Sequence, residues 1–477
     1  MTKEEGEKII SGEQKFDIKK IQARKTLTNY PKSVVITYDS SRQFTNLESE
    51  VQSIEDRRKE CFYYQIVYSI IVILGILVLS ERLSITKNNP KKRIKTFISL
   101  FRSQSSSEEN STSFDTFIAT FCKDLELVLD IEKSILCSTQ GLDISSKLSA
   151  NQKQYKKNNA LLSLYSKLPS RIQLDKEIDF LNESKIDKVG IIVVSSHECD
   201  AQNQGDEKKS IVFGRVYTIT RKNTLFEIKS FASFCKSEFS HKRFASSIVV
   251  DQVSRLDKAG YKHIFYVSKT PYQDKFNFSL ADEEKDDDTE RLFFMNSDVI
   301  KQMKAVNNSI TIYPVFVSNY RIFDLKRGNK DKGCSYYLAS VEDVSKIEPL
   351  TRNAAAFLNL YNLEAVDKKK SSYNSVISYA SPINIYAADV LDNREIIHGL
   401  FGTDTNTSDR DTLFLFMAML HYAKNEKFGK FSTIKLNPYE DIFKDVGYKS
   451  TKFYHPQSSA KFNLLAFVYE VFHSVVG

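Results

Sequence analysis

The chain has 477 residues, 41% of them hydrophobic, and a net charge of +8, so it has room for a packed core and about two domains. A charge this mild permits contact with anionic lipid or nucleic acid but requires neither. The six cysteines are scattered and none forms a CxxC pair, which argues against a disulfide framework or a zinc ribbon.

The chain begins with a polar tail, residues 1–60, that we expect to be largely disordered. It is followed by Cys61 to Ser80, a run without a charged side chain. A helix of about 20 apolar residues crosses a hydrocarbon core of roughly 30 Å, and the tyrosines near the start of the run suit the membrane interface. The run therefore predicts a single transmembrane helix. The alternative is a buried core helix or a central strand.

Basic residues are concentrated after this run. Residues 81–102 carry seven Lys or Arg against one Glu, including Lys91, Lys92, Arg93 and Lys95. The positive-inside rule then places the C-terminal body in the cytoplasm, as expected for a single-pass membrane protein. The same basic flank can bind anionic lipid headgroups, at about 1 kcal/mol per charge.

A basic, Ser-rich linker over 81–113 precedes the clearest amphipathic helix in the chain. Its apolar residues recur at i, i+3, i+4 and i+7, which places them on one helical face. That stripe includes Phe114, Phe117, Phe121 and Leu125. It indicates either core packing or a homodimer interface. With two weaker helical segments behind it, it predicts a helical subdomain over 114–183.

The pattern changes to that of an α/β domain over 184–477. Three short buried strands, a hairpin and two helices follow one another in the order β-β-β-α-β-α-β, with the helices crossing between parallel strands. The strands are expected at 189–195, 263–267 and 310–317, the hairpin at 210–234, and the helices before Gly260 and at 298–306. The remaining residues are expected to complete the same domain.

This mixed-sheet order is that of the ribonuclease H-like fold, and the segment 188–325 resembles a divergent Piwi-type domain of the Argonaute class. VGIIVVSS (189–196), with the hairpin after it, stands in the place of the first three strands. AGYKHIFYVSKTPY (259–272) corresponds to the strand that carries an aspartate in that family, and NNSITIYPVFVSNYRIF (307–323) to the next strand. Doubly wound sensor domains with a parallel sheet share this pattern.

The resemblance implies a catalytic centre in which three or four carboxylates hold two divalent metal ions about 4 Å apart. The sequence departs from that pattern, because the first strand ends in serines and Lys269 follows the second, where its charge would oppose the metals. Candidate substitutes for the missing carboxylates are Glu198, Asp200 and Glu227. We therefore favour a non-catalytic version of the fold.

Other chemistry has little support. His197 to Asp200 is dense in potential metal ligands, but adjacent residues of an extended chain point to opposite sides, and no second cluster has zinc-site spacing. The acidic run 282–290 lacks the glycine and the ligand spacing of a calcium loop. No GxSxG, phosphate-loop or GxGxxG motif is present. We expect no cofactor, and a divalent metal only if the chain is a nuclease.

Three functions remain open. The first is a membrane-tethered cytoplasmic module that binds or senses a ligand, nucleic acid or protein partner without catalysis. The second is a metal-dependent nuclease of ribonuclease H-like fold, and the third is a structural membrane adaptor that dimerises through the stripe at 114–125. The missing carboxylates favour the first over the second, whereas the stripe is compatible with both the first and the third.

Overall fold

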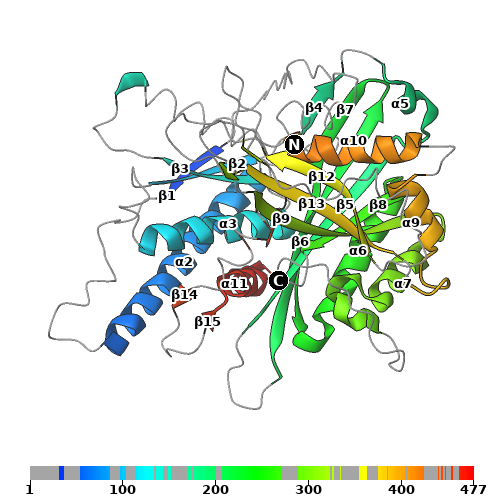
Figure 1. Ribbon diagram of the computed structural model, residues 1–477. Coiled ribbons are helices and arrows are strands. Elements are labelled where there is room, and N and C mark those ends of the chain that lie inside the picture. Colours follow the sequence, from blue (N-terminus) through cyan, green and yellow to red (C-terminus); the bar gives the residue numbers. More distant parts are fainter. Residues whose placement is uncertain are drawn as a thin grey trace.

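The computed structural model describes part of the chain, and its elements are drawn in Figure 1. The described residues are 32–36, 54–85, 97–103, 113–133, 136–142, 149–151, 169–174, 177–199, 207–269, 288–322, 325–326, 333–334, 354–362, 374–383, 385–402, 407–423, 439, 442–443, 446, 453–454 and 461–476.

An eight-stranded mixed sheet is the largest sheet of the described residues. Its strand order is β12-β13-β9-β8-β5-β6-β7-β4. The strands are β4 (Ser170–Gln173), β5 (Lys188–Glu198), β6 (Lys209–Lys222), β7 (Leu225–Phe239), β8 (His263–Lys269), β9 (Thr311–Ile322), β12 (Ala354–Asn362) and β13 (Asn374–Pro382). Only the neighbours β5, β8 and β9 pair in parallel within it. The predicted mixed α/β sheet is confirmed.

The element order along the chain is also the predicted one. β5, β6 and β7 form an antiparallel meander, after which α6 (Ser247–Lys258) leads to β8 and α7 (Ser297–Val306) leads to β9. β5, β8 and β9 run parallel, and such strands need long connections like these between them. The segments at 189–195, 263–267 and 310–317 coincide with these three strands.

Helices cover both faces of the sheet, which explains why the interior of β5 is continuously apolar. On one face Gly190 lies under Leu256 of α6, which packs on α7. On the opposite face, in the row of Ile191, Tyr313 of β9 lies against Gly399 of α9 (Asn393–Leu400). α10 (Ser408–Ala423) packs beside α9 on that second face.

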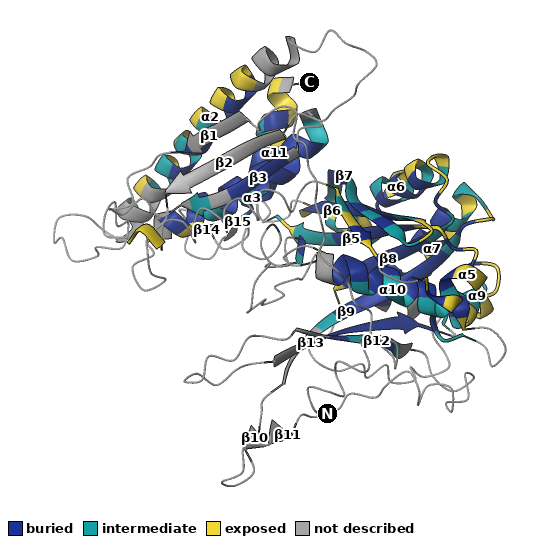
Figure 2. Cartoon of the chain, turned by 90° about the horizontal axis from the view of Figure 1, so that it is seen from above, coloured by how far each residue is buried: buried dark blue, intermediate teal, exposed yellow. Residues whose placement is uncertain are grey.

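A second sheet has three parallel strands in the order β1-β2-β3. Its strands are β1 (Lys32–Ile36), β2 (Phe97–Ser103) and β3 (Leu136–Leu142). The helix α2 (Ile54–Ile85) connects β1 to β2, and α3 (Ser113–Lys133) connects β2 to β3. The N-terminal part is thus a β-α-β-α-β unit, drawn apart from the larger sheet in Figure 2.

Three predicted segment boundaries differ from the structure. The tail 1–60 contains β1 and the start of α2, and the expected linker 81–113 contains β2. The segment 114–183 holds α3 and α5 (Asp179–Glu183), as expected of helices, but also β3 and β4. Because β4 pairs with β7, the end of that segment belongs to the larger sheet. Short parallel and edge strands carry too little periodicity to be recognised from sequence.

The predicted apolar run is helical and lies within α2. Residues Phe62–Leu79 have a mean hydropathy of 2.3, and 28% of them are buried against the rest of the chain. By length and composition this helix can cross a membrane, which is weak evidence that it does. The alternative of a buried central strand is excluded, because the segment is a helix.

The apolar stripe of α3 is part of the core of a single chain. Phe117, Phe121 and Leu125 are at most 1% exposed. The C-terminal helix α11 (Leu464–Val476) packs on α3, which also contacts β3 and β7. This burial agrees with the core-packing alternative, and the homodimer through the stripe stays a prediction. Phe114 is the second residue of α3, and its side chain lies outside the described residues.

The remaining elements are short. They are the 3-10 helices η2 (Ser240–Ala245) and η3 (Asp288–Met295), and the two-residue strand pairs β10 (Leu325–Lys326) with β11 (Gly333–Cys334) and β14 (Phe453–Tyr454) with β15 (Lys461–Phe462).

Candidate functional site

The site expected from the ribonuclease H-like order is at the carboxyl ends of β5 and β8. Ligands of open α/β sheets bind outside this end of the parallel strands. β5 and β8 pair with Val193 opposite Val267 and Val194 opposite Ser268. The side chains beyond this pair are Ser195, Ser196, His197 and Glu198 on β5 and Lys269 on β8. Neither strand offers a carboxylate at the positions that face each other.

The candidate carboxylates do not converge. Glu198, at the end of β5, forms an ion pair with Arg243 of η2. Glu227 lies in β7 near the opposite end of β5, in register with Thr220 and Lys188, and pairs with Arg171 of β4 at 3.1 Å. A strand rises about 3.3 Å per residue, so these two carboxylates are separated by about 33 Å along the sheet.

Asp200, the third candidate, lies outside the described residues. Within those residues, no three His, Cys, Asp or Glu side chains are placed to hold a metal ion together.

His197 lies at this edge of the sheet, close to the positive charges of Lys269 and Arg243. Its ring stacks on Phe213, with 5.8 Å between ring centroids. Burial, followed by the nearby charges of Lys269 and Arg243, lowers the pKa of His197 to about 4. The imidazole is therefore neutral at physiological pH. Cations that oppose protonation of His197 also oppose a metal ion and favour an anion.

The start of β6 and the end of β7 add an exposed ring and further lysines to this edge. Lys209 is paired with Phe239 in the sheet register. The Ser240 amide donates a hydrogen bond to the Lys208 carbonyl at 2.8 Å, which fixes η2 against β6. Phe239 is 42% exposed. Its ring lies parallel to that of His241 at 5.9 Å between centroids.

We call the exposed residues Lys208, Lys209, Phe239, Lys242 and Lys269 the basic edge. The structure records no ion pair for its four lysines among the described residues.

The acidic side chains next to the basic edge already have partners. Glu207 contacts His241 at 2.5 Å, and Glu238 contacts Lys236 at 2.7 Å. Glu238 also accepts a hydrogen bond from Ser246 at 2.9 Å. With Glu198 held by Arg243, both Glu198 and Glu238 are paired with cations within the fold. The lysines of the basic edge thus present net positive charge to solvent around an aromatic ring.

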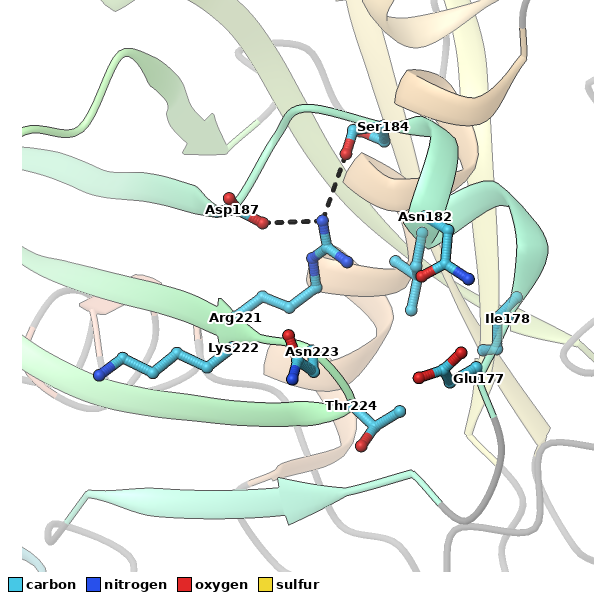
Figure 3. A pocket seen from close by; sticks show the side chains of 10 residues that line it. Glu177, Ile178, Asn182, Ser184, Asp187, Arg221, Lys222, Asn223 and Thr224 are labelled. Carbon is cyan, nitrogen blue, oxygen red and sulfur yellow. Dashed lines mark hydrogen bonds and ion pairs between the residues drawn. The ribbon is translucent and has the colours of Figure 1, made fainter.

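A polar cavity of about 570 Å³ lies at the other end of β5, between α5 and the β6–β7 turn (Figure 3). The side chain of Arg221 is 8% exposed there, and its Nη2 donates to Asp187 Oδ1 at 2.7 Å and to the Ser184 carbonyl at 3.3 Å. The lining holds two basic residues, Arg221 and Lys222, and two acids, Glu177 and Asp187. The charges balance, and Arg221 fastens α5 to the hairpin.

Comparison with known proteins gives structural matches only. No protein-family model and no curated protein matches the chain. The structure is similar to A. aeolicus Argonaute (12% identity, TM-score 0.29, covering 71% of this chain and 41% of that one). It is also similar to Kluyveromyces polysporus Argonaute with a guide RNA (12% identity, TM-score 0.30, covering 72% of this chain and 36% of that one). A third similar structure is Drosophila Piwi (9% identity, TM-score 0.33, covering 78% of this chain and 42% of that one).

The predicted resemblance to the Argonaute class thus has a counterpart in solved Argonaute and Piwi structures, at low identity. The chain spans less than half the length of each of these three. At such TM-scores nothing about activity, substrate or partner passes from those proteins to this chain.

Sequence reasoning missed the basic edge. Its lysines come from three separate segments, and Phe239 ends an alternating strand, where an aromatic residue is typical of core. Only the fold brings them together and shows that the ring is exposed.

Proposed function

We propose that the chain is a non-catalytic α/β module of ribonuclease H-like fold that binds single-stranded nucleic acid at the basic edge and is attached to a membrane through α2. The observation that carries the binding function is the exposed ring of Phe239 among Lys208, Lys209 and Lys242. Proteins that bind single strands combine lysine-rich surfaces for phosphates with aromatic rings on which bases stack.

The absence of a catalytic role is supported by the ends of β5 and β8. Val194 and Ser268 face each other where two metal-binding carboxylates are required, and Lys269 follows directly. Two-metal hydrolysis needs carboxylates that converge on two metal ions about 4 Å apart. Glu198 and Glu227 lie at opposite ends of the sheet, and both are held by arginines.

Membrane attachment is supported by the uncharged stretch within α2 and by the basic residues that follow it. Lys91, Lys92, Arg93 and Lys95 supply charge that anionic headgroups attract. The excess of Lys and Arg after α2 supports a cytoplasmic position of the α/β body. The binding function does not depend on this attachment, because the basic edge lies on the larger sheet.

The test of binding is fluorescence anisotropy with end-labelled single-stranded RNA and DNA and with a duplex of the same sequence. The variant Lys208→Glu/Lys242→Glu reverses two charges of the basic edge, and Lys258→Glu/Lys229→Glu makes the same change outside it. Each reversal places a negative charge beside phosphate, so we expect the first variant to bind at least about tenfold more weakly.

The control should bind within about twofold of the original chain. Equal weakening of both variants, or no binding by the original chain, would refute the assignment. Tighter binding of the duplex than of the single strand would refute the role of the exposed ring.

A further inference from the structure

The two faces of α2 differ in what covers them. Large apolar side chains that are 44–62% exposed lie at intervals of three or four residues along one face, namely Tyr63, Val67, Ile71, Leu74 and Val78. We call them the outer stripe. At 100° per residue they fall on the side opposite to the buried residues Gln65, Ser69, Ile73 and Ile76.

The inner face of α2 is part of the protein core. Phe62 makes an edge-to-face contact with Phe462 of β15 at 5.1 Å between centroids, and α2 also contacts α3 and α11. Ser69 Oγ donates to the Gln65 carbonyl at 2.8 Å, so polar groups of the helix are placed on this inner face. The outer stripe, by contrast, exposes only apolar residues and one tyrosine.

The strand pairing constrains how α2 can meet a membrane. β1 precedes α2 and β2 follows it, yet the two strands pair in parallel from Lys32 opposite Ile98 to Ile36 opposite Arg102. A helix that crosses the bilayer puts the residues before and after it on opposite sides. β1 and β2 could not then share a sheet, because a bilayer core of roughly 30 Å would separate them.

We propose that α2 lies in the plane of the membrane interface, with the outer stripe at the boundary between headgroups and acyl chains, instead of crossing the bilayer. This inference rests on the proposed membrane attachment and replaces the single-pass topology predicted from the sequence. Helices of this kind bury one apolar face about 5–10 Å into the interface. The apolar inner face, which a simple surface helix would lack, is explained by the protein core that covers it.

The occupant of the outer stripe is lipid because of the charge beside it. The segment 81–102, which begins in the last turn of α2 and ends in β2, carries seven Lys or Arg against one Glu. Such a segment is attracted to anionic headgroups. Parallel pairing of two copies through the outer stripe would instead bring two such segments together.

The first experiment tests the strand pairing in membrane-bound full-length chain. Val34 and Leu100 are register partners in β1 and β2, and neighbouring strands lie about 4.8 Å apart, within reach of a disulfide. We expect Val34→Cys/Leu100→Cys to cross-link on mild oxidation. The control is Val34→Cys/Thr139→Cys, which joins β1 to β3, two strands away, and should not cross-link.

The second experiment is flotation with phosphatidylcholine vesicles with and without phosphatidylserine. We expect binding that requires phosphatidylserine, is released by alkaline carbonate, and falls at least about tenfold in Ile71→Glu. The control Ala259→Glu, at the exposed end of α6, should bind like the original chain.

Four outcomes are distinguishable. Cross-linking with carbonate-sensitive binding supports the proposal. Carbonate-resistant binding without cross-linking overturns it in favour of a span, and leaves membrane attachment standing. Cross-linking without binding to any vesicle means that the proposed attachment itself is wrong. A dimer that Ile71→Glu dissociates would identify a second copy as the occupant and overturn the proposal.

Discussion

A buried ion pair fastens the two sheets to each other, and its removal should destabilise the whole chain. Arg215 of β6 and Glu126 of α3 are 6% and 3% exposed, with 3.7 Å between Nη2 and Oε1. Glu126 also accepts a hydrogen bond from Thr139 at 3.3 Å, and Lys123 Nζ lies 3.6 Å from it. Removing one partner of a buried pair leaves the other charge uncompensated, which costs about 3–5 kcal/mol.

We expect Arg215→Ala to lower the free energy of unfolding by about 3 kcal/mol, the low end of that range, because Lys123 still faces Glu126. The double variant Arg215→Met/Glu126→Leu should lose far less, since apolar residues of similar size replace a buried pair at little cost. Urea unfolding followed by circular dichroism measures both. A loss under about 1 kcal/mol in Arg215→Ala, or a double variant that is less stable than the single one, would refute this account.

Three further predictions concern stacking, packing and pH. Phe239→Ala should weaken single-strand binding by about 1–3 kcal/mol in anisotropy, as loss of a stacked base predicts. Gly214→Ala should lower thermal stability by at least about 1–3 kcal/mol, because its Cβ would meet the Val193 carbonyl and the Phe234 ring. The same change at Gly75 in α2, which has nothing within 4 Å, should be neutral or stabilising. Burial lowers the pKa of His421 from 6.5 to about 3, so its contribution to stability is complete above pH 6.5 and is lost as the pH falls toward 3. A melting-temperature profile between these values should be flatter for His421→Phe.

The elements of the larger sheet could be predicted where the sequence is strongly periodic. Buried on both faces, β5 is a continuous apolar run, and the crossovers α6 and α7 have clear helical periods. The strand β4 has four residues and was missed, because its only recognisable property is its pairing with β7. Periodicity records which side of an element is buried, but not which element covers it.

The same limit applies to the predictions for α2 and α3. The stripe of α3 is covered by α11, which lies more than 300 residues further along the chain, so the sequence could not distinguish core from a dimer surface. In the proposed position of α2, its uncharged stretch faces the protein core on one side and lipid on the other. Mean hydropathy averages over both sides of the helix, so it does not distinguish them. The resulting value and the length of the stretch are those of a transmembrane helix.

The prediction of a non-catalytic fold rests on the serines at the end of β5 and on Lys269. That Glu198 and Glu227 are far apart, and each paired with an arginine, required the fold. The basic edge could not be predicted, because nothing in the sequence near Phe239 distinguishes an exposed ring from a buried one.

The most direct test of the central claim is one titration that records binding and cleavage together. The full chain is added to end-labelled single-stranded RNA with Mg²⁺ or Mn²⁺, at several salt concentrations, and each sample is read by anisotropy and then on a denaturing gel. The account predicts saturable binding, with an association constant whose logarithm falls linearly with the logarithm of the salt concentration. The RNA should stay intact throughout. Metal-dependent cleavage that Glu198→Gln abolishes, or the absence of binding at low salt, would contradict it.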